Sequence, residues 1–237
     1  MSFSNIKFIF LKELRSFFNS AVAYIVMVVF LIIMGYFFVS NLFLMNMASL
    51  RTVFELTPFL LLFFAPAMTM RLISEEKKSG TLELLMTKPV REFEIILGKF
   101  LASWVLFILT LVPTLTYYVT ISILGSLDIG PVIGGYLGLM FVSAVFMAVS
   151  VFGSALTENQ VVAFIVSFLI VFILFVLDKS VVYAPGYLAT TLEYLSIDYH
   201  FSNIARGIID SRDILYYFSM TGFALFLGTV TLQKRRV

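Results

Sequence analysis

Apolar runs long enough to cross a lipid bilayer as helices recur through this sequence. A spanning helix needs about 20 mostly apolar residues, and six stretches approach or exceed that length. The chain is 61% hydrophobic and 13% charged, whereas soluble domains average about 45–50% and 25%. We therefore predict an all-α integral membrane protein, one domain over residues 1–237. The spans are expected at residues 21–40, 56–70, 132–156, 161–177 and 214–232, with one more contained within residues 97–124.

The distribution of Lys and Arg predicts the orientation of these spans. An even number of spans puts both termini on one side, and twelve of the sixteen Lys and Arg residues fall on that side. Cytoplasmic loops carry an excess of Lys and Arg. We therefore expect both termini, the charged segment 71–91 and the short turn 157–160 in the cytoplasm, and residues 178–213 outside.

The first residues have the pattern of an amphipathic helix. Apolar side chains recur every three or four positions, with Lys12 and Arg15 on other faces. Such a helix lies in the membrane interface rather than across it. We expect an interfacial helix over residues 1–19 that bends into the first span, with an apolar face of Phe3, Ile6, Phe10, Leu14 and Phe17.

The charged segment 71–91 contains the signals of a short helix. Thr81 is a suitable N-cap, and Glu83 in the first turn is favourable at the positive end of a helix. Gly80 permits a sharp bend before the helix, and Pro89 ends it. We predict a helix of about two turns on the cytoplasmic side.

This short helix has an apolar face made by Leu82, Leu85 and Met86. Two turns are not stable alone in water, so the helix must dock on another surface. Spacing leaves two alternatives open. The face rests on the bilayer, or it enters a groove of a soluble partner.

Residues 178–213 are too apolar for a solvated loop and too interrupted for a span. We expect short interfacial or re-entrant helices there, buried in protein at shallow depth. His200 is expected to be a hydrogen-bonded residue rather than a metal ligand. Arg206, Asp210 and Asp213 follow at helical spacing and predict a structural ion pair, which we favour over a contact with substrate.

Several classes of function are excluded by missing residues. The chain has no cysteine and one histidine, so thiol chemistry and multi-histidine metal sites are ruled out. The apolar cores of the spans hold no ionisable residue of the kind that ion-coupled carriers need. No phosphate-binding loop of the Gly-x-x-x-x-Gly-Lys-Ser/Thr type is present. We expect no catalytic residue, metal, cofactor or nucleic acid, and any energy must come from another chain.

Five blocks of sequence together resemble the type-2 ABC-transporter permease family. They are residues 65–71, 75–85 (Glu-Glu-Lys-Lys-Ser-Gly-Thr-Leu-Glu-Leu-Leu), 97–99, 157–160 and 199–213. The likeness covers essentially the whole chain. Within the family the sequence looks most similar to the gliding-motility permease subunit, with the nitrous-oxide-reductase maturation permease as a near relative.

The resemblance implies roles for the segments described above. Residues 1–19 would be a connecting helix, residues 71–96 a cytoplasmic coupling segment and residues 178–213 the external helices, which contain His200, Arg206, Asp210 and Asp213. Docking on a cytoplasmic ATPase then becomes the favoured alternative for the short helix. The implied ATPase-coupling residues are Glu75, Glu76, Gly80, Thr81, Leu82, Glu83, Leu85, Met86, Glu158 and Asn159.

The same resemblance implies partners and a location. Two ATPase subunits would bind ATP and Mg²⁺ beneath the membrane. A second permease subunit, of the same or a different chain, would complete the pore in the bilayer. The location would be a bacterial inner membrane, and a periplasmic or envelope partner is a further possibility.

Two functions follow from these expectations. In the first, ATP hydrolysis by the partner drives export or conformational work through the permease, linked to gliding motility. In the second, the chain is a mechanical or assembly anchor that relays ATP-driven motion to an envelope protein, and no substrate crosses the membrane. A self-powered carrier or channel is disfavoured by the uncharged span interiors.

Overall fold

The computed structural model describes residues 3–44, 49–125, 128–180 and 185–234. The described residues form helices and no strand. The elements are α1 (Phe3–Phe18), α2 (Ala21–Leu44), α3 (Arg51–Lys78), α4 (Thr81–Met86), α5 (Glu92–Leu111), a 3₁₀ turn η1 (Val112–Thr114), α6 (Leu115–Leu124), α7 (Ile129–Leu156), α8 (Gln160–Ser180), α9 (Gly186–Leu195), α10 (Ile197–Ala205) and α11 (Ser211–Gln233).

The predicted fold class, all-α with six spans, is confirmed. Among the described residues, six helical segments are long and apolar enough to cross a membrane. They are α2, α3, the continuous stretch α5–η1–α6, α7, α8 and α11. The 3₁₀ turn holds Pro113, as expected of a proline that interrupts a spanning helix without ending it.

The second span is longer than the sequence predicted. We expected residues 56–70, whereas α3 runs over 28 residues from Arg51 to Lys78. At 1.5 Å per residue such a helix is about 42 Å long, against about 30 Å of hydrocarbon. The first part of the charged segment is therefore an extension of the span and not a loop.

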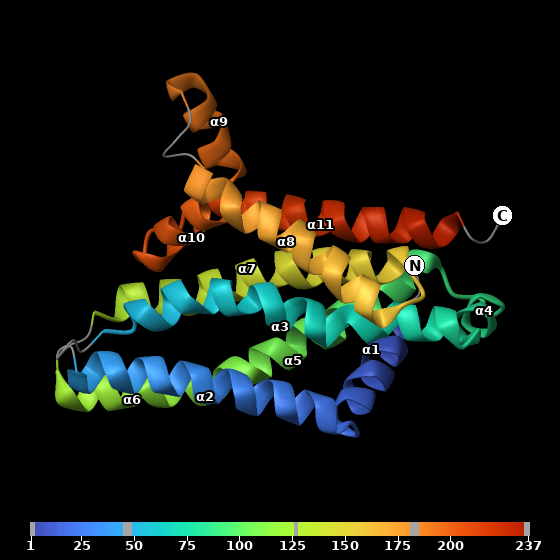
Figure 1. Ribbon diagram of the computed structural model, residues 1–237, viewed down its shortest axis with the longest axis horizontal. Coiled ribbons are helices and arrows are strands. Elements are labelled where there is room, and N and C mark those ends of the chain that lie inside the picture. The colour runs from blue at the N-terminus through green and yellow to red at the C-terminus, as the bar shows by residue number, and fades with distance from the viewer. Residues whose placement is uncertain (1–2, 45–48, 126–127, 181–184, 235–237) are drawn as a thin grey trace.

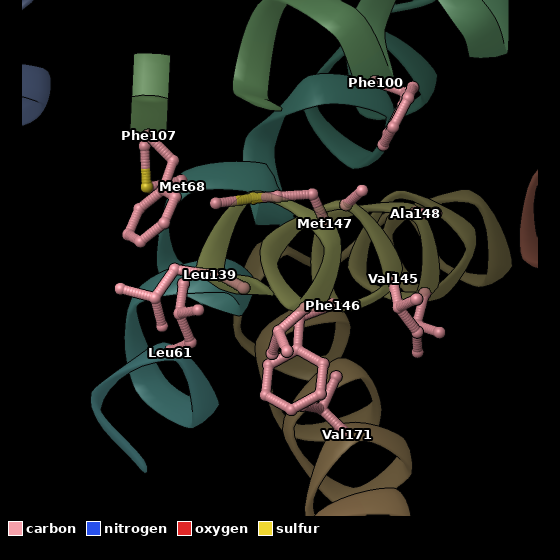
Figure 2. Close-up of a cluster of buried hydrophobic side chains, with 14 of the residues drawn as sticks. Leu61, Met68, Phe100, Phe107, Leu139, Val145, Phe146, Met147, Ala148 and Val171 are labelled. Atoms are coloured by element: carbon pink, nitrogen blue, oxygen red, sulfur yellow. The ribbon is translucent and has the colours of Figure 1, made fainter. Parts of the chain in front are cut away.

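Helix α7 is the centre of the bundle. It packs against α3, α5, α8, α10 and α11, and Leu139, Phe146 and Met147 are 0% exposed. Figure 2 shows Leu139 beside Leu61 of α3, Phe146 beside Val171 of α8, and Met147 pointing toward Met68 of α3. By contrast, less than a third of the apolar stretch of α2, α8 and α11 is buried, so these helices present apolar surface outward.

The two ends of the bundle carry different elements. Figure 1 places α4 and the end of α11 toward one end of the long axis, and α10 toward the other. Helix α1 crosses the bundle near the α4 end. This separation gives the molecule two candidate sites, one around α4 and one around α10.

Candidate functional site

Helix α4 is linked to α3 by a sharp turn at Gly80. The φ angle of Gly80 is +72°, a left-handed value that glycine adopts without strain. The hydroxyl groups of Ser79 and Thr81 lie 2.9 Å apart in this turn. The helix is six residues long, with Glu83 in its first turn, at the length and place that the sequence predicted.

Two details of this helix differ from the prediction. Gly80, not Thr81, is the N-cap, and no side chain caps the helix, because the left-handed backbone already turns the chain. The apolar face also points inward: Leu82 is 2% exposed, and Leu85 and Met86 pack against the core. The bundle covers Leu82 and part of Leu85 and Met86, so Leu82 is not presented to a partner, and docking of the helix on an ATPase stays a prediction.

The outward surface of α4 is made by other residues. Leu84 is 67% exposed, and Thr81, Glu83, Thr87 and Lys88 surround it on the exposed side. Of the apolar side chains of α4, Leu84 is thus the most exposed.

Beside α4 lies a buried ion cluster centred on Lys99 of α5. The Lys99 ammonium Nζ is 2.9 Å from Glu13 Oε1 of α1 and 2.9 Å from Glu76 Oε2 of α3. It also donates to the carbonyl oxygen of Leu72 at 2.7 Å. The Lys99 side chain is 0% exposed. Three helices that are distant in sequence therefore meet at one charge.

Lys12 completes this cluster at its solvent side. Its ammonium group lies 3.0 Å from Glu76 Oε1 and 3.3 Å from Glu13 Oε1. Burial opposes its charge, but the hydrogen bond to Glu76 and the Glu13 carboxylate outweigh burial and raise the pKa of Lys12. The two ammonium groups thus balance the two carboxylates of Glu13 and Glu76. This pairing offsets the free-energy cost of removing the buried charges from water.

Helix α1 is fitted closely against α5. A Cβ atom at Gly98 would lie 2.7 Å from Ile9 Cγ2, so only glycine permits this approach. At the other end of the contact, the Asn5 side-chain amide donates to Glu94 Oε2 at 3.0 Å and to the Pro89 carbonyl at 3.3 Å. Helix α1 thereby holds both α5 and the segment that joins α5 to α4.

The end of α3 is bound to α7 and α8. The Ser154 hydroxyl of α7 accepts from the Ile73 and Ser74 N–H groups at 3.2 Å each and donates to the Met70 carbonyl at 2.9 Å. Lys77 donates to the carbonyl oxygen of Ala155. These contacts fix the last two turns of α3 on the central helix.

The turn 157–160 lies on the same side of α3. Arg71 Nε donates to Gln160 Oε1 at 3.2 Å. Asn159 Oδ1 accepts from the Val161 N–H at 2.9 Å and so begins α8. Glu158 is exposed and Glu75 is exposed. Of the residues assigned to ATPase coupling, Glu75, Glu83 and Glu158 thus offer surface charge, whereas Glu76 lies inside the ion cluster and Asn159 acts as a helix cap.

The second candidate site lies at the α10 end. His200 Nδ1 is 2.6 Å from Asp213 Oδ1, and its Nε2 is 3.1 Å from the Tyr194 carbonyl oxygen. The His200 ring also stacks on Tyr216, with ring centroids 4.0 Å apart. His200 is buried, so its structure agrees with the expected role of a hydrogen-bonded residue.

The predicted ion pair of Arg206 is not present. Helix α10 ends at Ala205, and Gly207 turns the chain with a φ of +86°, so Arg206 and Asp210 do not share a helix. Asp210 instead caps α11 by accepting from the Arg212 N–H at 2.9 Å. Asp213 pairs with His200. The spacing of four between Arg206 and Asp210 predicted a shared helix, and Gly207 between them ends it.

Sequence reasoning also missed Lys99, Glu13 and Ser154. The sequence places Lys99 among the residues counted on the cytoplasmic side, and it assigns no role to Glu13 or Ser154. A usable signal did exist for α1: Glu13 follows Ile6 and Ile9 at spacings of seven and four. All three side chains lie on one helical face, which buries a carboxylate and requires a cation opposite.

A comparison with protein-family models finds one match over nearly the whole chain. The model is described as "ABC-2 family transporter protein" and matches residues 8–232. Among curated proteins no significant match is found. The matched range contains the ion cluster, α4 and the α10 end.

Proposed function

From the premise that this chain belongs to the ABC-2 transporter family, we propose that it is a membrane subunit driven by a separate cytoplasmic ATPase. It is a multi-pass membrane protein with six candidate spans. The orientation we propose puts α1, α4 and the end of α11 in the cytoplasm, since the excess of Lys and Arg lies on that side. ATP and Mg²⁺ would be bound by the partner and not by this chain.

One observation carries the proposal, namely the fastening of α4 to the bundle. Helix α4 joins the ends of α3 and α5, and Lys99 ties those two helices and α1 together. A force on α4 therefore acts on three helices at once. Coupling between distant sites requires such a contiguous set of packed elements, and the exposed Leu84 supplies a contact for the ATPase.

The test replaces Leu84 with aspartate. We expect Leu84→Asp to remove the ATPase from complexes purified in mild detergent, because a buried apolar contact is exchanged for a desolvated charge. Ile208→Asp is the matched control, since Ile208 is 64% exposed on the α10 side. Recovery of a fully active ATPase with Leu84→Asp, identified by mass spectrometry and by ATP hydrolysis, would refute this role for α4.

Finer assignments are also part of the proposal. Likeness of residues 199–213 to gliding-motility permeases supports a link to motility in a bacterial inner membrane. A second permease subunit is expected from the likeness to the family, and it would share the exposed apolar surface of α2, α8 and α11 with lipid. The alternative of a mechanical anchor has one observation in its favour, since α9 projects away from the bundle (Figure 1). ATP-dependent uptake or export in vesicles containing the complex would decide against the anchor.

A further inference from the structure

A cavity of about 880 Å³ lies at the end of the molecule opposite α4. It is formed by the start of α3, the start of α7, the end of α8 and α10. Its apolar lining includes Phe54, Val132, Phe175 and Phe201. The volume falls within the range of about 300–1,000 Å³ that is usual for ligand sites.

The charged side chains around this cavity form two ion pairs and leave one arginine over. Arg51 pairs with Glu55 at 2.6 Å, and Lys179 pairs with Asp198 at 2.8 Å. Arg206 also lines the cavity, but it forms no ion pair with any carboxylate in the described part of the chain. One guanidinium group is therefore left over, and a guanidinium binds carboxylate and phosphate groups through a planar fork of N–H donors.

The position of Arg206 is set by close backbone packing. A Cβ at Gly134 of α7 would lie 2.0 Å from the carbonyl oxygen of Ile204, and a Cβ at Gly207 would lie 3.1 Å from the carbonyl carbon of Gly130. Only glycines allow the end of α10 to approach α7 so closely. Arg206, which follows α10 and precedes Gly207, is thus held at the edge of the cavity.

We propose that this cavity binds a monoanionic amphiphile. Its carboxylate or phosphate group lies on Arg206, and its hydrocarbon chain lies along the phenylalanine-lined wall. The ligand comes either from an anionic membrane lipid or from a free amphiphile such as a fatty acid. The proposal deepens the proposed function by naming a ligand class, and it rests on that function for the outward-facing position of the cavity.

Photocrosslinking tests this proposal on the full chain in nanodiscs, without the ATPase. The probes are palmitate and phosphatidylglycerol that carry a diazirine in the acyl chain, and the neutral counterparts are the matching hexadecanol and diacylglycerol. We expect crosslinks on peptides that contain Phe54, Phe175 or Phe201. Arg206→Gln should weaken labelling about tenfold, the size of one charge-assisted hydrogen bond.

Two further variants make the test decisive. Arg212→Gln is the matched control, because Arg212 is exposed on the same side but does not line the cavity, and its labelling should be unchanged. Ala205→Phe reduces the cavity volume and should lower labelling without altering charge. A retained thermal midpoint, read from the single tryptophan, shows that each variant is folded.

The outcomes separate cleanly. Labelling by the lipid probe alone, or by palmitate alone, supports the proposal and identifies the source. Equal labelling by neutral probes, or labelling that survives both Arg206→Gln and Ala205→Phe, overturns it. Because no ATPase is present, Leu84→Asp should leave labelling unchanged. The role of α4 in binding an ATPase is tested only by the co-purification experiment, so the two proposals can fail independently.

Discussion

Replacement of Lys99 by methionine tests the ion cluster most directly. Methionine keeps the length of the side chain and removes the ammonium group. Glu13 and Glu76 then face each other with only Lys12 nearby, and the cluster changes from neutral to one net negative charge. The carbonyl oxygen of Leu72 also loses the hydrogen bond from Lys99.

The expected cost follows from the burial of the partners. The side chains of Glu13 and Glu76 are 9% and 16% exposed, whereas Lys12 is 61% exposed and cannot replace a buried cation. Removal of one partner from a buried pair costs about 3–5 kcal/mol of the free energy of unfolding. At about 2–4 °C per kcal/mol for a chain of this size, the thermal midpoint should fall by roughly 6–20 °C.

The chain offers a built-in probe for this measurement. Trp104 is the only tryptophan, and its indole N–H donates to the Met140 carbonyl at 3.0 Å. Its fluorescence during heating therefore reports on the packing of α5 against α7. Lys88→Met is the matched control, because Lys88 is an exposed lysine beside α4 and should shift the midpoint by about 1 °C or less.

A second substitution distinguishes charge from shape. Lys99→Met combined with Glu76→Gln restores neutrality, and it should recover a large part of the lost stability. The reasoning fails if Lys99→Met melts within 1 °C of the unchanged protein. It also fails if the added Glu76→Gln lowers the midpoint further, since the carboxylate would then be stabilising without its cation.

Three further predictions concern other contacts. Gly134→Leu should displace α10 from α7 and cost about 1–3 kcal/mol or more, because even a Cβ atom there would lie 2.0 Å from the Ile204 carbonyl oxygen. Ser154→Ala should cost about 1–3 kcal/mol of the free energy of unfolding, since it removes the hydroxyl group that bonds three backbone groups of α3 to α7. His200→Phe leaves the buried Asp213 carboxylate without its partner at 2.6 Å and should loosen the packing of α10 on α11.

Each of these changes has a control. Gly222→Leu should be neutral, since no atom lies within 4 Å of a Cβ there. Ser219→Ala removes an exposed hydroxyl of the same type and should leave the thermal midpoint unchanged. For His200→Phe, a single cysteine in place of Ile204 of α10, which is 1% exposed, reports loosening through faster maleimide labelling, and Asp213→Asn should reduce the effect. Equal effects in variant and control would contradict the reasoning in each case.

The spans could be predicted because hydrophobicity acts locally. Each apolar run must avoid water wherever its neighbours lie, so length and composition are sufficient. The end of α3 could not be placed in the same way. Residues 71–78 have the composition of a soluble loop, yet they remain helical because Ser154 and Lys77 bond across to α7.

The interior of the candidate site was not predictable from spacing. Glu13 and Lys99 are 86 residues apart in the chain, and no local pattern records their meeting. Spacing correctly grouped Leu82, Leu85 and Met86, but it could not say whether that face turns toward the bundle or toward a partner. The direction depends on the angle at Gly80, which is a property of the backbone and of the packing around it.

The contacts that hold the two ends of the bundle together differ in how steeply they weaken with distance. At the α10 end, close contacts at Gly134 and Gly207 join α10 to α7, and such contacts are lost with a displacement of an ångström or less. At the α4 end the Gly98–Ile9 contact holds α1 on α5 in the same way. The Lys99 cluster adds Coulomb attraction there, which falls only as the inverse of distance. Because the long lysine and glutamate side chains can adjust their torsions, the ionic contacts of α3 should survive a small shift that would break the glycine contacts of α10 with α7.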